Sequence, residues 1–290
     1  MSCRLSDKWL ERGASLNHGV RRRKELPIHA NVGYFRGRSA MRVAAIYDIH
    51  GNLPALEAVL QDIAQAEVDL VVVGGDVVAG PMPRETLACL LNFAIPVEFI
   101  QGNADREVVA QMAGTDAGAV PEHVREIVRW VAQQLYPDHA RLLASWPSTF
   151  GVEIGGLGQV LFCHATPRSD TEVFTRLTPG ERLAPVFEGL NAPLVICGHT
   201  HMQFDRTIGR TRVVNAGSVG IPYGEPGAYW LLLGPNVQFR HTRYDLTEAA
   251  ARIRDTGYPQ AQDFAEHNVL EPPSQEEALE VFTQMEFAAA

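Results

Sequence analysis

An alternation of short apolar runs with helical patterns constrains this chain more than any other feature of its sequence. Apolar runs at Val43–Tyr47, Val68–Val73 and Val97–Ile100 have the length and composition of buried strands. Between them, Leu53–Ala66 carries apolar residues at helical spacing, and Pro83–Phe93 is also expected to form a helix. Strand, helix, strand, helix, strand in this rhythm predicts parallel strands joined by crossover helices.

The later part of the chain shows more strands and shorter connections. The expected elements are helices at Glu122–Leu135 and Asp138–Trp146, strands at Thr149–Ile154 and Gln159–His164, a helix at Pro179–Leu190, strands at Leu194–Cys197, Phe204–Ile208, Thr211–Asn215, Tyr229–Leu233 and Val237–Tyr244, and helices at Leu246–Arg254 and Gln275–Phe287. Short turns containing glycine separate several of these strands, which predicts hairpins. Two half-sheets, each with helices outside, indicate an α/β fold: one domain built as a four-layer α/β/β/α sandwich.

The first 40 residues differ in charge from the rest of the chain. They contain nine Lys or Arg and three Asp or Glu, whereas the whole chain contains 25 and 34, so residues 41–290 carry 16 basic and 31 acidic residues. We expect residues 1–40 to be a disordered basic head or sequence preceding the true start at Met41, with a nucleic-acid arm or targeting peptide as alternatives. The main domain is expected at 41–257, followed by a partly helical C-terminal extension at 258–290.

Composition disfavours several kinds of partner. The strongly acidic body makes non-specific binding of nucleic acid unfavourable. No apolar run reaches the roughly 18–20 residues that a membrane-spanning helix needs, so no membrane partner is expected. The cysteines show no C-x-x-C spacing, and we interpret them as small core residues kept reduced in a cytosol, which predicts a cytoplasmic location. These are Cys3, Cys89, Cys163 and Cys197.

Five short polar cassettes follow the apolar runs. They are Asp48-Ile49-His50, Gly75-Asp76, Gly102-Asn103-Ala104-Asp105, Cys163-His164 and Gly198-His199-Thr200-His201. Ligands in open α/β folds gather beyond the carboxyl ends of the strands, so we expect these cassettes to meet there. In extended chain, Asp48 and His50 would point to one side while Ile49 packs into the core. A lone Asp or His is weak evidence, but the five cassettes in this order predict a metal centre.

The candidate ligands suit two divalent ions. They are Asp48, His50, Asp76, Asn103, His164, His199 and His201. Two such ions, about 3.5–4 Å apart, serve in-line displacement at phosphorus. Mixed imidazole and oxygen ligands favour Mn, Fe, Zn, Co or Ni over Ca, and Mn is our first choice.

The ordered set D-x-H, G-D, G-N-x-D, H and G-H-T-H resembles the calcineurin-like metallophosphoesterase superfamily, most closely its small bacterial and archaeal phosphodiesterases. The resemblance extends from about Met41 to Tyr244. It implies an α/β/β/α domain in which Asp76 bridges two ions. It further implies that one ion is held by Asp48, His50 and His201, and the other by Asn103, His164 and His199.

The charges of this ligand set fit hydroxide chemistry. Two divalent cations and two carboxylates leave about two positive charges, which would lower the pKa of a bridging water and hold a phosphate ester. We expect the resulting hydroxide to attack phosphorus opposite the leaving oxygen. Asn103 and Arg168 are candidate substrate contacts, although a solvated loop arginine is the commoner role. Tyr223 and Trp230 could stack on a base or pack in the core.

Ala104 departs from the superfamily pattern. Many members have a histidine at this position that protonates the leaving oxygen, a contribution commonly worth about 10²–10⁴-fold. The catalytic proton donor is therefore unassigned. The enzyme could favour esters with good leaving groups, another residue or a metal-bound water could supply the proton, or the domain could serve only for binding.

We predict a metal-dependent phosphoric ester hydrolase, specifically a dinuclear phosphodiesterase acting on a small phosphate ester or nucleotide. The alternatives on the same site are a phosphomonoesterase and a nucleotide pyrophosphatase. A non-catalytic scaffold, like the retromer subunit that shares this fold, is disfavoured because every ligand position is filled. The sequence leaves open whether the chain forms a homo-oligomer.

Overall fold

The computed structural model describes residues 41–115 and 122–288. They belong to one compact unit, Ala40–Ala290. The basic head expected at residues 1–40 lies outside the described residues, so its interpretation stays a prediction. So do the expected boundaries of the main domain and the C-terminal extension.

The first sheet has five strands in the order β10-β9-β1-β2-β3. Their bounds are β1 Val43–Ile46, β2 Leu70–Val73, β3 Val97–Phe99, β9 Ala228–Leu233 and β10 Val237–Thr242. β1 pairs in parallel with β2, and β2 with β3, whereas β9 runs antiparallel to both β1 and β10. The predicted parallel crossover unit is therefore present at the start of the domain.

The second sheet also has five strands, in the order β4-β5-β6-β8-β7. Their bounds are β4 Thr149–Ile154, β5 Gly158–Cys163, β6 Leu194–Cys197, β7 Phe204–Ile208 and β8 Thr211–Asn215. The expected hairpins are the antiparallel pairs β4–β5 and β7–β8. β5, β6 and β8 are parallel neighbours, so their carboxyl ends meet at one edge of the sheet.

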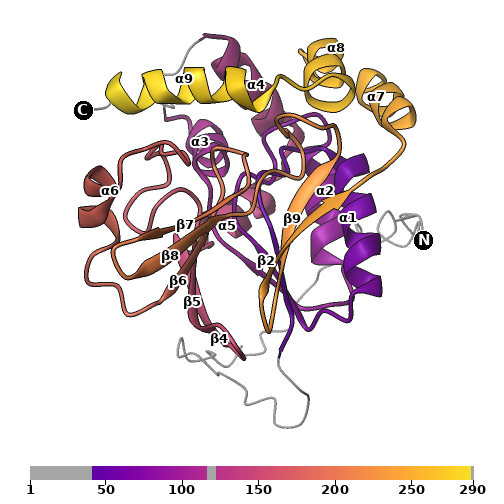
Figure 1. The fold of residues 1–290 in the computed structure, drawn as a ribbon. Coiled ribbons are helices and arrows are strands. Elements are labelled where there is room, and N and C mark those ends of the chain that lie inside the picture. The colour runs from indigo at the N-terminus through magenta and orange to yellow at the C-terminus, as the bar shows by residue number, and fades with distance from the viewer. Residues whose placement is uncertain (1–40, 116–121, 289–290) are drawn as a thin grey trace, which may run out of the picture. The chain divides into compact units, whose positions relative to one another are not determined.

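Most helices lie outside the two sheets, whereas the C-terminal helix crosses the top of the view in Figure 1. The helices are α1 Leu53–Gln65, α2 Pro83–Leu91, α3 Asn103–Met112, α4 Glu122–Gln134, α5 Pro137–Ala144, α6 Gly180–Phe187, α7 Leu246–Arg254, α8 Ala261–Phe264, the π-helix η2 Ala265–Leu270 and α9 Gln275–Ala288. α1 and α2 cover the first sheet, and α6 covers the second (Figure 1). The four-layer α/β/β/α sandwich is confirmed.

Strand β1 shows how the layers are held together. Val43 and Ala45 lie in the core between the two sheets, whereas Ala44 and Ile46 lie in the core beneath the helices. All four side chains are fully buried. Because successive side chains of a strand point to opposite faces, a strand between two cores is apolar throughout.

Helix α3 was not expected from the sequence. It begins at Asn103, so this cassette is the first turn of a helix rather than an irregular loop. Gly102 precedes it, and the backbone N–H of Gly102 donates to Asp105 Oδ2 at 3.3 Å. The carboxylate at the third helical position thereby binds the entry to the helix, which is the usual arrangement at an N-terminus.

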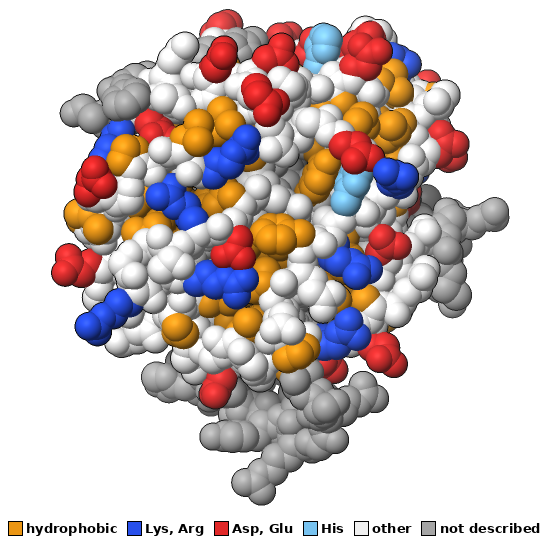
Figure 2. Space-filling model, in the orientation of Figure 1, with side chains coloured by type: hydrophobic (Ala, Val, Ile, Leu, Met, Phe, Trp, Pro, Cys, Tyr) orange, Lys and Arg blue, Asp and Glu red, His pale blue; other side chains and the backbone are white. Residues whose placement is uncertain are grey.

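Within the described part of the chain, no helix combines the length and the apolar character needed to cross a bilayer. On the face shown in Figure 2, basic and acidic side chains are interspersed rather than gathered by sign. That face therefore lacks a continuous basic surface of the kind that binds nucleic acid.

Candidate metal centre

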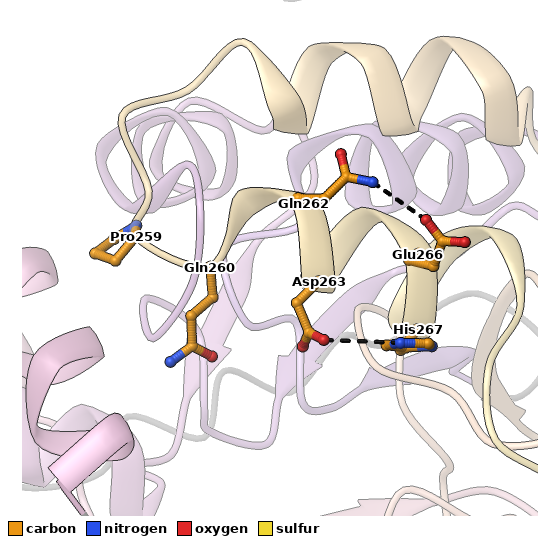
Figure 3. A pocket seen from close by; sticks show the side chains of 6 residues that line it. All are labelled: Pro259, Gln260, Gln262, Asp263, Glu266 and His267. Carbon is orange, nitrogen blue, oxygen red and sulfur yellow. Dashed lines mark hydrogen bonds and ion pairs between the residues drawn. The ribbon is translucent and has the colours of Figure 1, made fainter.

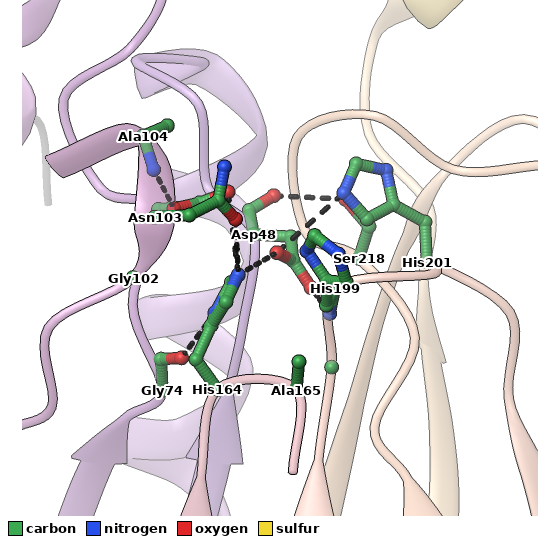
Figure 4. Close-up of polar contacts among 12 residues, drawn as sticks. Asp48, Gly74, Gly102, Asn103, Ala104, His164, Ala165, His199, His201 and Ser218 are labelled. Atoms are coloured by element: carbon green, nitrogen blue, oxygen red, sulfur yellow. Dashed lines mark hydrogen bonds and ion pairs between the residues drawn. The ribbon is translucent and has the colours of Figure 1, made fainter. Parts of the chain in front are cut away.

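The predicted ligands converge at the carboxyl ends of the strands. Asp48 follows β1, Asp76 follows β2 and Asn103 follows β3, while His164 and His199 follow β5 and β6. Asp48, Asn103, His164, His199 and His201 come together from both sheets in Figure 4. The structure thus assembles residues that lie far apart in the sequence, as the edge rule for α/β folds requires.

A first group is formed by Asp48, His50 and His201. The two imidazole Nε2 atoms lie 3.3 Å apart, and His201 Nε2 lies 3.5 Å from Asp48 Oδ1. Asp48 is fully buried, and the two histidine side chains are about nine-tenths buried. Three ligand atoms in this proximity can hold one divalent ion from one side.

A second group is formed by Asp76, His164 and His199. His164 Nε2 lies 3.4 Å from Asp76 Oδ2 and 3.1 Å from the side-chain oxygen of Asn103. Asn103 therefore lies beside this group, and its role as a ligand stays a prediction.

Asp76 lies between the two groups. Its Oδ2 is 3.4 Å from His164 Nε2 in one group and 3.7 Å from His50 Nε2 in the other. Its Oδ1 accepts a hydrogen bond of 2.8 Å from the backbone N–H of Ala104, which fixes the carboxylate. A carboxylate in this place can contact both of two adjacent ions.

The extended backbone expected at Asp48 and His50 is wrong. Their φ angles are 53° and 47°, and Asp76, His199 and His201 have φ of 53°, 66° and 59°. This left-handed conformation costs about 1–2 kcal/mol per residue for a side chain with a Cβ. Five such residues in one centre indicate that the surrounding structure imposes the strain, as happens at functional sites.

Long-range hydrogen bonds hold this backbone. Asp48 N–H donates to Gly75 O at 3.2 Å, and His50 N–H donates to Asp76 O at 2.8 Å. The N–H of His199 donates to Asp48 Oδ2 at 2.8 Å. The left-handed backbone at His199 and His201 also directs their side chains apart, so that they lie in different groups of candidate ligands.

Two polar groups in the centre have surroundings that a bound cation would satisfy. Among the described residues, Asp48 Oδ1 is buried and has no hydrogen-bond partner. The Asn103 amide directs one atom at His164 Nε2 and His199 Nδ1, each at 3.1 Å. Hydrogen bonding alone would place the amide nitrogen there, whereas a cation among these atoms would take the amide oxygen. The donor set therefore fits a metal ion.

Three of the histidines are oriented by backbone carbonyls. His164 Nδ1 lies 2.9 Å from Gly74 O, His201 Nδ1 lies 2.8 Å from Ile221 O, and His50 Nδ1 lies 3.3 Å from Ala79 O. A proton on each Nδ1 leaves the Nε2 lone pair free to face the centre. Metal-binding histidines usually have such a second partner.

The electrostatics of the centre also favour positive charge. Burial raises the pKa of Asp76, but His164, His50 and His199 lower it more, so that its pKa lies below the ordinary value. Burial lowers the pKa of His164, but Asp76 and Asp48 outweigh it and raise that pKa to about 10. The two carboxylates thus favour a cation beside them, and histidines bind a metal ion in their neutral form.

Asp105 and Ser218 support the ligands and were not assigned a role from the sequence. Asp105 Oδ1 accepts from Val77 N–H at 2.9 Å and Val78 N–H at 3.2 Å, which fixes the turn after Asp76. Burial, followed by repulsion from Asp76, raises the pKa of Asp105 to about 7. Ser218 Oγ donates to Asp48 O at 2.8 Å. The acidic residue three positions after Gly102 was the available signal for Asp105.

The weaker candidates have distinct environments. Arg168 is exposed, and its Nε donates to both oxygens of Glu172 at 2.9 and 3.1 Å. Trp230 is fully buried and donates to Thr242 Oγ1 at 3.0 Å, so it is a core residue. Tyr223 lies beside the centre, with its ring stacked on His201. The substrate roles given to Asn103 and Arg168 stay predictions.

The hollow drawn in Figure 3 is separate from these ligands. It has a volume of about 460 Å³ and is lined by Pro259, Gln260, Gln262, Asp263, Glu266 and His267. Its polar side chains pair along the helical segment: Gln262 donates to Glu266 at 3.2 Å, and His267 lies 3.7 Å from Asp263. None of the predicted ligands lines it.

Comparison with known proteins identifies the family of this fold. The family model described as the calcineurin-like phosphoesterase superfamily domain matches residues 41–234. The uncharacterized protein MJ0912 of Methanocaldococcus jannaschii is 28% identical over 166 residues, which cover 56% of this chain and 63% of that protein. Phosphodiesterase YfcE of Escherichia coli K12 is 27% identical over 203 residues, which cover 66% of this chain and 87% of that protein.

Two solved structures share the architecture. The metallophosphoesterase from Sphaerobacter thermophilus is 26% identical, with a TM-score of 0.63 over 80% of this chain and 100% of that chain. The hypothetical protein PH1004 from Pyrococcus horikoshii OT3 is 19% identical, with a TM-score of 0.69 over 81% of this chain and 100% of that chain, and shows the fold alone.

The fold and its relatives define a class of hydrolases that act on phosphoesters. The chain belongs to the calcineurin-like phosphoesterase superfamily. The family predicted from the five cassettes is thereby confirmed, and so is the predicted enzyme class.

Proposed function

We propose that this chain is a dinuclear-metal phosphodiesterase that hydrolyses small phosphate diesters, including nucleotide diesters. One observation carries the proposal. Two groups of three ligand residues lie side by side, and the Asp76 carboxylate is within 3.7 Å of a histidine nitrogen from each. That arrangement suits two ions sharing one bridging carboxylate.

The candidate ligands would divide between the two ions. Asp48, His50 and His201 would hold one ion, Asn103, His164 and His199 the other, and Asp76 both. When bound, the two ions would lower the pKa of a water between them and offset charge on the phosphoryl oxygens. The carbonyls of Gly74, Ala79 and Ile221 keep the imidazoles turned towards the centre.

Ala104 determines which esters we expect to react fastest. Its side chain is a methyl group, and its N–H is already bound to Asp76. This position therefore cannot protonate a departing oxygen. Diesters with acidic leaving groups need no such proton, so they should react faster than esters of simple alcohols.

A matrix of metals and substrates tests the proposal. The full chain is stripped of metal and assayed with each first-row divalent ion on bis(p-nitrophenyl) phosphate, on p-nitrophenyl phosphate and on a nucleoside triphosphate. We expect Mn to give the highest rate and the diester to be preferred. A preference for the monoester would favour the phosphomonoesterase, and cleavage of nucleoside triphosphates between phosphates would favour the pyrophosphatase. No turnover with any metal would favour the non-catalytic scaffold.

The Asp76→Asn variant tests the bridging role. It keeps the shape of the side chain but removes the charge that two ions would share, so turnover at saturating metal should be abolished. Asp138→Asn is the matched control, because this carboxylate is exposed and its ion pair among the described residues is with Arg141, on the surface of α5. Full activity in Asp76→Asn would refute the scheme.

A further inference from the structure

The C-terminal helix α9 packs against the residue next to a ligand. Met202, which follows His201, is 2% exposed and packs with Ala278 and Leu279 of α9. Both of these α9 side chains are themselves buried. The helix therefore limits how far the chain on one side of His201 can move.

The same helix also reaches His201 through an aromatic pair. The Tyr223 ring stacks on the His201 ring, with centroids 5.9 Å apart and planes inclined by 28°. Behind it, the ring of Phe282 meets Tyr223 edge-on at 6.0 Å and 80°. Aromatic pairs in these geometries are attractive and directional, so Phe282 supports the position of Tyr223.

The loop that carries Tyr223 is held by hydrogen bonds on both sides of this residue. The Ile221 carbonyl oxygen lies 2.8 Å from His201 Nδ1, and the Ile221 N–H donates to Ser218 Oγ at 2.8 Å. Gly224 N–H donates to Pro273 O at 2.9 Å, just before α9 begins. The loop is thus held between the metal centre and the C-terminal segment.

The far end of α9 is fixed by a buried carboxylate. Glu286 is 6% exposed and accepts hydrogen bonds from the hydroxyls of Thr175 and Thr178. Arg182 donates to Glu286 O at 3.2 Å, and its Nη1 lies 3.9 Å from the Glu286 carboxylate. A carboxylate is costly to bury unless it is satisfied in this way, so the contact is a specific anchor.

We propose that α9 is a working part of the metal centre, with Tyr223 and Phe282 as positioning residues for His201. The Ile221 carbonyl and the Tyr223 ring together fix the orientation of this imidazole, and α9 holds both in place. The proposal rests on the proposed two-metal function. It goes beyond the family assignment, because α9 lies outside the matched residues 41–234.

The consequence is a difference between the two ions. Loss of a group that orients a metal ligand typically lowers metal affinity about 10–100-fold. His201 serves only the group with Asp48 and His50, so loss of the α9 contact should weaken one ion and spare the other. A general loss of stability would weaken both together.

Metal titration of the full chain separates these outcomes. Mn binding is measured by calorimetry and by equilibrium dialysis with elemental analysis, for wild type, Phe282→Ala, Phe282→Leu and Tyr223→Leu. We expect two ions in wild type, and in each variant one ion of unchanged affinity and one that binds 10–100-fold more weakly. Tyr223→Phe, which keeps the ring, should restore wild-type affinity. Val281→Ala is the matched control on α9, because Val281 is 56% exposed.

Two results would overturn the proposal. One is unchanged affinity for both ions in the folded Phe282→Ala and Tyr223→Leu variants. The other is an equal loss at both sites, accompanied by a lower melting temperature in Phe282→Leu as well, which would make α9 a purely structural element. Failure of the wild-type protein to bind two ions would instead refute the proposed function, and the titration of the wild type alone shows this.

Discussion

Gly102→Ala is the sharpest steric probe of the Asp76 carboxylate, for which we propose a bridging role. A Cβ added at Gly102 would lie 2.2 Å from Asp76 Oδ1 and 2.4 Å from Asp76 N. The φ of Gly102 is −92°, which any residue can adopt, so the substitution brings no backbone strain of its own. The whole effect therefore falls on Asp76 and the turn around it.

The magnitude follows from the distances. Ordinary contact begins at 3.4 Å, so the carboxylate has to move by about 1 Å. Asp76 is buried, and the N–H of Ala104 already binds its Oδ1, so it has little free space in which to move. A displacement of about 1 Å at a catalytic group commonly costs about 10²-fold in rate. We expect at least that loss in kcat/KM for the chromogenic diester.

The assay needs a glycine control. Gly151→Ala is suitable, because a Cβ there meets nothing within 4 Å and Gly151 lies in β4, away from the ligands. Both variants are assayed with saturating Mn, and circular dichroism reports whether they are folded. A folded Gly102→Ala protein with kcat/KM within about twofold of wild type would refute our placement of Asp76, because such a change is far below the expected 10²-fold.

Four further predictions concern stability. Thr86 is fully buried and its Oγ1 has no hydrogen-bond partner among the described residues, so Thr86→Val should raise the free energy of unfolding by about 1 kcal/mol. Thr242→Val leaves Trp230 Nε1 unpaired, so it should lower the free energy of unfolding by about 1–3 kcal/mol. Urea titrations measure both changes. Mn at 100 times its dissociation constant should stabilise the folded chain by about 2.7 kcal/mol per ion. The melting temperature should therefore rise, and chelation of the metal should abolish the rise. An unchanged melting temperature would contradict metal binding to the folded state. Burial raises the pKa of the Tyr244 hydroxyl from 10.0 to about 12, so the folded state keeps a proton that the unfolded state loses. This contribution is complete below pH 10 and is lost as pH rises through 12, and Tyr244→Phe should spare about 2–3 kcal/mol of the alkaline loss.

The strands and the positions of the candidate ligands were predictable because buried strands are apolar in sequence. β1, β2 and β6 are buried nearly throughout, so each is an unbroken apolar run, and a polar residue directly after such a run marks the strand end. The carboxyl ends of parallel strands meet at one edge of a sheet, which brings Asp48 and Asp76 together in the first sheet and His164 and His199 together in the second.

The backbone of the ligands could not be predicted in this way. The left-handed conformation of Asp48 depends on Gly75 O, and its carboxylate is bound by the N–H of His199, which is 151 residues away. No local pattern records these partners. Helix α3 was missed for a related reason, since its first turn contains polar ligand and support residues rather than an apolar stripe.

The aromatic residues show the same division. Tyr223 and Trp230 were equivalent candidates in the sequence, yet Trp230 is fully buried and Tyr223 stacks on His201. The contact between Tyr223 and Phe282 joins segments that are nearly 60 residues apart. The support of the centre by α9 is therefore a property of packing, which only the structure reveals.

The number and spacing of the metal ions in the centre distinguish a two-metal site from a single-metal site. Crystals of the full chain grown with Mn, measured at the Mn absorption edge, would show each ion as an anomalous peak. We expect two peaks about 3.5–4 Å apart, with Asp76 between them. A single peak, or a pair that Asp76 does not bridge, would refute the two-metal site.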